Sequence, residues 1–167
     1  MNEPRDLDRD LLQIYLADHQ AGARGVMNRL DQMTAYTDLP IAPVIAQLHA
    51  EVREEFAWVA ALVTRLEVSP GRVKQSGARV GELLGRLKLN GRWRRRSPLT
   101  PVVELEMLSA AVVGKQRLFE TLTDLRDDLP VNPEELANLS ARAERQLSDI
   151  TDAHERLRRT AFKNHEG

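Results

Sequence analysis

Residues 45–66 read IAQLHAEVREEFAWVAALVTRL, and this stretch decides the fold. Its apolar side chains recur every three or four residues, which places them on one face of a helix. That face consists of Ile45, Leu48, Val52, Glu55, Val59, Leu62 and Leu66. Glu55 is ionisable where an apolar side chain is expected. Because a buried charge is costly unless it is paired or bound to a metal ion, Glu55 is a candidate for chemistry.

Three other stretches have a helix-period apolar face with an ionisable residue near its middle. The first face consists of Leu12, Leu16, His19, Ala23, Val26, Leu30 and Met33; the next of Val103, Glu106, Ala110 and Val113; and the last of Leu136, Ser140, Ala143, Leu147, Ile150, His154, Leu157 and Ala161. The candidate interior groups are therefore His19, Glu106 and His154. Four amphipathic helices without strand signals predict an all-α four-helix bundle.

Length and composition favour one soluble helical domain over residues 1–167. The 42% share of apolar residues and the 29% share of charged residues are typical of helices with one wet face. The chain has no cysteine, which excludes disulfides, thiolate metal sites and cysteine nucleophiles. No stretch approaches 18 uncharged apolar residues, and the charged start lacks a signal-peptide core, so we expect a cytoplasmic protein without a membrane span.

Start and stop signals place the helices at about 5–36, 40–67, 98–128 and 133–164. The expected signals are Asp6 or Asp8 before the first helix, Pro40 and Pro43 in the opening turn of the second, Ser97 and Pro98 before the third, and Asn132, Pro133 and Glu135 before the fourth. The first and last connections are short, so each pair of helices should be an antiparallel hairpin. The long connection, 68–97, should contain a short helix at 71–88.

A connection of that length can return the chain along the bundle, so that the second and third helices run parallel. This up-down-down-up order is that of ferritin-like bundles. Five segments of the sequence also resemble those of a known group of proteins: Tyr15–Gly22, Arg86–Arg92, Leu105–Glu106, Gly114–Lys115 and Arg142–Glu144. With them the chain resembles the ferritin-like four-helix bundles, in particular a set of uncharacterised bacterial proteins of this size. The resemblance covers most of the chain and implies the fold without implying an activity.

The usual di-iron pattern of ferritin-like metal proteins, with Glu-x-x-His on two helices, does not occur. The residues three before the four histidines are Leu16, Ala46, Thr151 and Phe162. Ferroxidase or oxygenase activity is therefore not implied by the fold.

A different interior site is still predicted from the folding of each hairpin. Folding the first hairpin about residue 38 brings His19 near Glu55, and folding the second about residue 131 brings His154 near Glu106. If all four lie in one layer, they suit iron, manganese or zinc, with Asp18 and Glu51 as substitute ligands. The alternative is one buried His–Glu pair on each hairpin, which satisfies the same groups without metal.

The connecting segment carries the second signal. Residues 70–97 contain nine basic residues and one acid, a net charge of +8, whereas the whole chain has a charge of −1. A predicted anion site therefore consists of Arg92, Trp93, Arg94, Arg95 and Arg96, with nucleic acid or anionic lipid as its partner. The alternative is a solvated loop that lies along an acidic bundle.

No nucleophile constellation, phosphate loop or dinucleotide fingerprint stands out, so we predict no catalytic residues. The sequence favours a non-catalytic ferritin-like protein, a structural or stress-associated interaction module that self-associates, with a dimer as the simplest form. Two alternatives stay open: an atypical carboxylate and histidine metal protein, and an anion-binding module that uses the arginine-rich segment.

Overall fold

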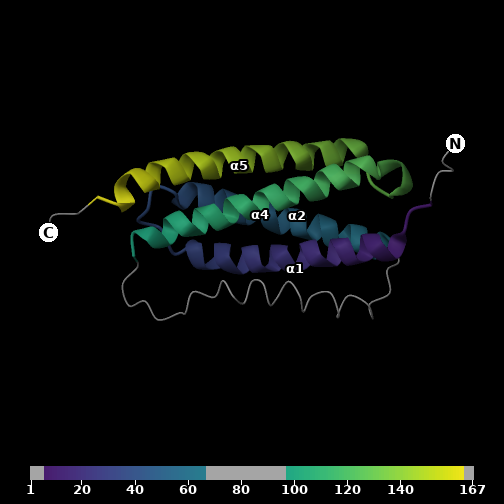
Figure 1. Cartoon of the computed structure of the whole chain (residues 1–167), viewed down its shortest axis with the longest axis horizontal. Coiled ribbons are helices and arrows are strands. Elements are labelled where there is room, and N and C mark those ends of the chain that lie inside the picture. The colour runs from purple at the N-terminus through teal and green to yellow at the C-terminus, as the bar shows by residue number, and fades with distance from the viewer. Residues whose placement is uncertain (1–5, 67–96, 164–167) are drawn as a thin grey trace.

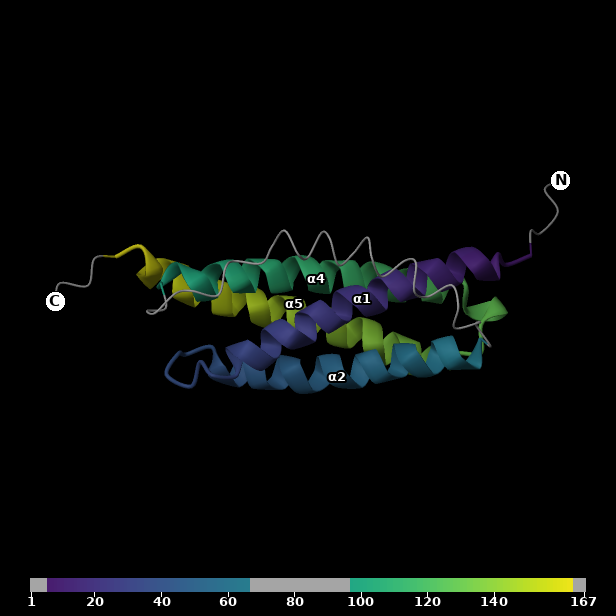
Figure 2. The same cartoon turned by 90° about the horizontal axis from the view of Figure 1, so that it is seen from below.

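The computed structural model describes residues 6–66 and 97–163, and within these ranges the regular structure is entirely helical. The long helices are α1 (Arg9–Met33), α2 (Ala42–Arg65), α4 (Leu99–Asp124) and α5 (Pro133–Ala161), and a short 3₁₀ turn spans Arg126–Asp128. The four long helices lie lengthwise beside one another, so the described chain is an all-α four-helix bundle (Figures 1 and 2). The helix predicted at 71–88 lies outside the described residues.

The helices form two antiparallel hairpins. α1 packs on α2, and α4 packs most extensively on α5. α2 and α4 both begin at the same end of the bundle and run in the same direction, as their colours in Figure 1 show. The residues between α2 and α4 must therefore connect opposite ends of the bundle.

The first hairpin has shorter helices than predicted. Asp8 caps α1, because its carboxylate accepts hydrogen bonds from the backbone N–H groups of Asp10 and Leu11 at 3.1 and 3.0 Å. The helix ends at Met33, three residues before the predicted end, and a turn follows. Pro40 lies in that turn and not in the opening of α2, which begins at Ala42.

The second hairpin keeps the predicted start of its last helix. The Asn132 side chain caps α5 by accepting hydrogen bonds from the N–H groups of Glu134 and Glu135. The start of α4 is one residue later than predicted, with the Ser97 hydroxyl accepting from the N–H of Leu99 at 3.3 Å. α4 ends at Asp124, earlier than predicted, because the chain tightens into the 3₁₀ turn.

The predicted apolar face of α2 is confirmed, since all seven of its members are buried. The predicted face of α4 is wrong: Val103 and Val113 are 38% and 39% exposed, and Glu106 and Ala110 are also exposed. The buried apolar side chains of α4 are instead Val102, Leu105, Leu108, Val112, Leu118, Phe119 and Leu122. Valine pairs at 102–103 and 112–113 fit either face, and packing against the other helices selects one of them.

The core consists of two apolar clusters, one toward each end of the bundle. The cluster at the end with the α1–α2 turn reaches Val52 on α2, Val112 on α4 and Ile150 on α5. The other cluster begins at Val59, Leu118 and Ala143 on the same three helices. The level between them contains polar side chains. None of the helices in the described part of the chain combines the length and apolar character needed to cross a membrane.

Candidate functional site

The level between the two apolar clusters contains three interior polar groups, one from each of three helices. Glu55 comes from α2, Lys115 from α4 and Gln146 from α5. The side chain of Glu55 is 3% exposed and that of Lys115 is 16% exposed, while Gln146 is 2% exposed. Each stands within a face whose other described members are mostly apolar. We call these three residues the central layer.

Hydrogen bonds join all three members of the central layer. The Lys115 ammonium donates to Glu55 Oε2 at 2.5 Å and to the side-chain oxygen of Gln146. The Gln146 amide N–H group in turn donates to Glu55 Oε1 at 2.9 Å. Both carboxylate oxygens of Glu55 are therefore occupied, and its charge is balanced by the ammonium. This is the arrangement that a buried charge requires.

The network continues from the central layer to the surface through Glu51. Gln146 Nε2 donates to Glu51 Oε2 at 2.7 Å, and Arg145 donates to Glu51 Oε1 at 2.6 Å. Gln47 adds a third donor at 3.1 Å. Burial alone would raise the pKa of Glu51, but these donors stabilise its charged form and the pKa lies below the usual value.

Lys115 is the one cation of the central layer, and its side chain is largely buried. Burial lowers its pKa from the usual value, and the nearby charge of Glu55 only partly opposes that shift. The ammonium is therefore held in the folded state at a cost that Glu55 offsets only in part.

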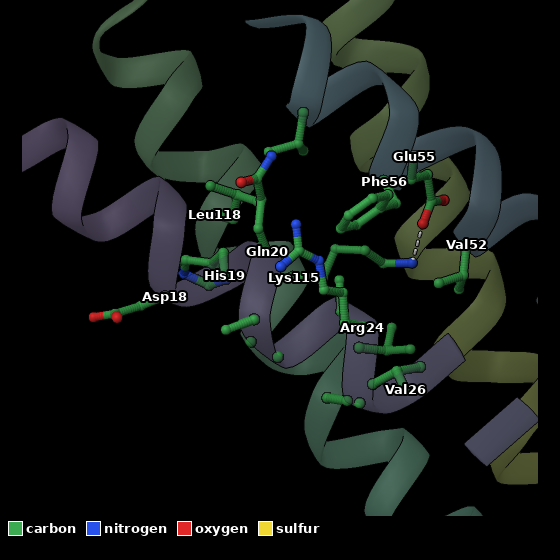
Figure 3. Close-up of a pocket in the computed structure, with 18 of the residues that line it drawn as sticks. Asp18, His19, Gln20, Arg24, Val26, Val52, Glu55, Phe56, Lys115 and Leu118 are labelled. Atoms are coloured by element: carbon green, nitrogen blue, oxygen red, sulfur yellow. Dashed lines mark hydrogen bonds and ion pairs between the residues drawn. The ribbon is translucent and has the colours of Figure 1, made fainter. Parts of the chain in front are cut away.

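A cavity of about 1050 Å³ adjoins the central layer between α1, α2 and α4 (Figure 3). Beside larger side chains, α1 contributes a run of small residues here, Ala21, Gly22 and Ala23, and α4 contributes Ala111 and Gly114. A Cβ added at Gly22 or Gly114 would meet no atom within 4 Å. The space exists because α1 and α4 place little side-chain volume at this level.

Most of the cavity wall is apolar, and nine polar or charged side chains also line it. Val52, Phe56, Val59, Leu118 and Phe119 form the apolar wall. Exposed residues of α1 and α4 stand at its edge, namely Arg24, Asn28 and Ala110. The cavity therefore opens to the surface between α1 and α4. A mainly apolar wall with polar groups placed around it is typical of a small-molecule site.

Among the polar side chains that α1 contributes to this site, His19 and Arg24 contact aromatic rings. His19 lies edge-on to Tyr15, with ring centroids 4.6 Å apart. Burial lowers its pKa from the usual value, which the negative charge of Asp18 opposes in part. Its imidazole is therefore mainly neutral at pH 7. The guanidinium carbon of Arg24 lies 5.7 Å from the ring centroid of Phe56, a cation–π arrangement.

The four residues predicted as metal ligands do not meet in one layer. His19 and Glu55 both line the cavity, but Glu55 bonds to Lys115 and Gln146. His154 and Glu106 form the pair expected from the hairpin, at 3.1 Å, with the Glu106 side chain 58% exposed.

No group of three or more histidine, aspartate or glutamate side chains suited to a metal ion occurs among the described residues, and this includes the substitutes Asp18 and Glu51. The structure does not bring the four predicted residues together, because α4 turns a different face inward from the one expected. This difference places Glu106 outside and Lys115 inside.

A second buried carboxylate, Glu104, was missed. It is 2% exposed, and it accepts hydrogen bonds from the Tyr36 hydroxyl at 2.6 Å and from Arg29 at 3.1 Å. Glu104 precedes the buried Leu105, so the correct face of α4 would have indicated it.

The predicted anion site, Arg92 to Arg96, lies outside the described residues and stays a prediction. Comparison of the chain with protein-family models, with curated proteins and with solved structures gave no match. The functional argument therefore depends on the residues of this chain alone.

Proposed function

We propose that this protein is a non-catalytic binding protein whose site is the cavity between α1, α2 and α4. The observation that carries the proposal is the cavity itself, about 1050 Å³ with a mainly apolar wall, beside a buried and charge-balanced central layer. Its volume is slightly above the range of about 300–1000 Å³ that is typical of small-molecule sites. Helical bundles commonly build such sites from side chains on facing helices.

The central layer supports a binding role over a reactive one. Lys115 and Glu55 satisfy each other, and Gln146 bonds to both. The ammonium of Lys115 donates to a carboxylate and to an amide, and these two contacts hold its nitrogen within the layer. The layer thus contributes to the cavity wall polar groups that are already hydrogen-bonded to one another.

The proposal includes the ferritin-like connectivity and the self-association that the sequence favours. The common direction of α2 and α4 supports the first. Exposed apolar side chains on α4, Leu99, Val103 and Val113, support the second. In this proposal the ferritin-like scaffold supports a binding cavity in place of a metal site.

The test is the binding of a neutral apolar fluorophore, N-phenyl-1-naphthylamine, to the full chain. We expect enhanced, saturable fluorescence with about one dye per chain. The variant Gly114→Leu places a side chain in open space within the cavity, so it should abolish binding while the protein stays folded.

Ala141→Leu is the matched control, because Ala141 is an exposed residue of α5 that does not line the cavity. This variant should bind the dye as the unchanged chain does. Absence of saturable binding to the unchanged chain, or equal binding by Gly114→Leu, would show that the cavity is not a binding site.

A further inference from the structure

We propose that the cavity selects a ligand with one acidic group on a long apolar body, and that Arg24 binds the acidic group. The inference rests on the proposed function, since it names the class of ligand for the same cavity. The inference rests on two observations. The first is which charged side chains at the cavity are paired with an opposite charge, and the second is the position of Arg24, which is not paired within residues 6–66 and 97–163.

Two of the three cations at the cavity are already neutralised. Lys115 is paired with Glu55 at 2.5 Å, and Arg29 is paired with Glu104 at 3.1 Å. Neither has a charge to spare for a ligand, because each faces a carboxylate that is almost completely buried. Arg24 has no carboxylate partner among the described residues. It is therefore the one uncompensated cation of the cavity wall in the described part of the chain.

The acids at the cavity do not change this balance. Glu55 is occupied by Lys115, and the carboxylate of Asp18 lies on the far side of His19 from the cavity and is directed away from it (Figure 3). His19 is mainly neutral at pH 7, because burial lowers its pKa. An anion that enters the cavity therefore meets a positive charge without a competing negative one.

The position of Arg24 suits an acidic group at the end of an apolar body. Arg24 on α1 and Phe56 on α2 both line the cavity (Figure 3), and the guanidinium carbon of Arg24 is 5.7 Å from the Phe56 ring centroid. A guanidinium over an aromatic face keeps N–H groups at its edge, which can bind a carboxylate in a bidentate way. The residue itself is exposed, so the acid would lie at the mouth of the cavity.

The rest of the cavity accepts hydrocarbon. Val52, Val59, Leu118 and Phe119 line its inner part, and burial of each methylene group of a ligand contributes favourably to binding. Small polar anions such as phosphate would leave this apolar wall in contact with water. The combination of one end charge and an apolar interior thus favours an amphiphilic monocarboxylate over a phosphate or a neutral lipid.

The test compares two probes that differ only in the head group, decanoate and decanol. Each is titrated below its aggregation concentration against the full chain with bound N-phenyl-1-naphthylamine. We expect decanoate to displace the dye at about a tenfold lower concentration than decanol, as one charge-assisted contact predicts. In Arg24→Gln this preference should disappear, so that decanoate and decanol displace the dye at equal concentrations.

Arg156→Gln is the matched control, because Arg156 is an exposed arginine of α5 that does not line the cavity. It should keep the full preference for decanoate. Equal displacement by the two probes in the unchanged chain, or an unchanged preference in Arg24→Gln, would overturn the inference and leave the proposed function in place.

Failure of the dye to bind the unchanged chain would overturn both proposals. One cause of such a failure, a second copy of the chain that occupies the cavity, can be tested separately. If a second copy of the chain fills the cavity, dye binding should decline as the protein concentration rises, and sedimentation equilibrium should show the dimer over the same range.

Discussion

The two buried carboxylates of this bundle are balanced in different ways. Glu55 and Glu104 are equally hidden, at 3% and 2% exposure. Glu104 is held by the Tyr36 hydroxyl and by Arg29, whose side chain is 27% exposed. Glu55 is held by Lys115, whose side chain is only 16% exposed. One charge is therefore compensated from the edge of the bundle and the other from within it.

The difference shows where the bundle depends most on pairing. If Glu104 is removed, Arg29 can turn to water. If Glu55 or Lys115 is removed alone, the charge that remains is more deeply buried than that of Arg29, since the side chains of Lys115 and Glu55 are 16% and 3% exposed and that of Arg29 is 27% exposed. The central layer should therefore tolerate joint changes better than single ones, as buried ion pairs commonly do.

The largest effect is expected from Lys115→Met, which leaves the carboxylate of Glu55 buried without its cation. Urea unfolding at pH 7 should give a free energy of unfolding lower by about 3–5 kcal/mol. Adding Glu55→Gln removes the unpaired charge and should recover more than half of the loss. If the double variant is as unstable as the single one, the charge balance is not what holds the central layer.

Glu104→Gln should have a smaller effect, a loss of about 1–3 kcal/mol, since it weakens hydrogen bonds to a charged group while Arg29 can reach water. Tyr36→Phe isolates the hydroxyl and should cost about 1 kcal/mol. Both are measured by urea unfolding under the same conditions. A loss from Glu104→Gln as large as that from Lys115→Met would remove the contrast between the two carboxylates.

Gly114→Ala tests the open space beside the central layer. Because the added Cβ meets no atom within 4 Å, the higher helix propensity of alanine should raise the free energy of unfolding by about 1 kcal/mol. Gly22→Ala, on the opposite wall, is the parallel case and should behave alike. Destabilisation by both would mean that the cavity is closed in solution.

The smallest expected effect is the contribution of His19 to the loss of stability at acidic pH. Its pKa in the folded state lies below the usual 6.5, so the unfolded chain binds more protons between these two values. The free energy of unfolding should therefore decline as the pH falls from about 6.5, the pKa of His19 in the unfolded chain, to the lower pKa of His19 in the folded protein. In His19→Gln this part of the decline should be absent between pH 7 and pH 5, above the range in which Glu51 is protonated. Identical pH profiles for the two proteins would contradict it.

The sequence predicted the bundle and its two hairpins well, because the apolar face of α2 is regular and the Asn132 cap is distinct. It also predicted the pair of His154 and Glu106, which depends only on hairpin geometry. It failed at α4, where valines at 102–103 and 112–113 allow two faces. Only packing against three neighbouring helices decides between them.

The correct face of α4 was nevertheless present as a regular series. Positions 101, 105, 108, 112, 115, 119 and 122 alternate steps of four and three, with Lys115 as the one charged member. The series 136, 139, 143, 146, 150, 153 and 157 places Gln146 at the same level of α5. The cavity could not be predicted in this way, because it depends on how closely α1 approaches α4.

The spacing of these faces gives the central layer a role in alignment. A helix with such a repeat can slide past its neighbours by seven residues, about 10 Å, and still match apolar with apolar. In this bundle such a slide would place Lys115 opposite Leu48 or Leu62 on α2, and opposite Leu139 or Ala153 on α5. A lone ammonium among hydrocarbon groups would penalise every shifted assembly, so a single polar level sets the register of the whole bundle.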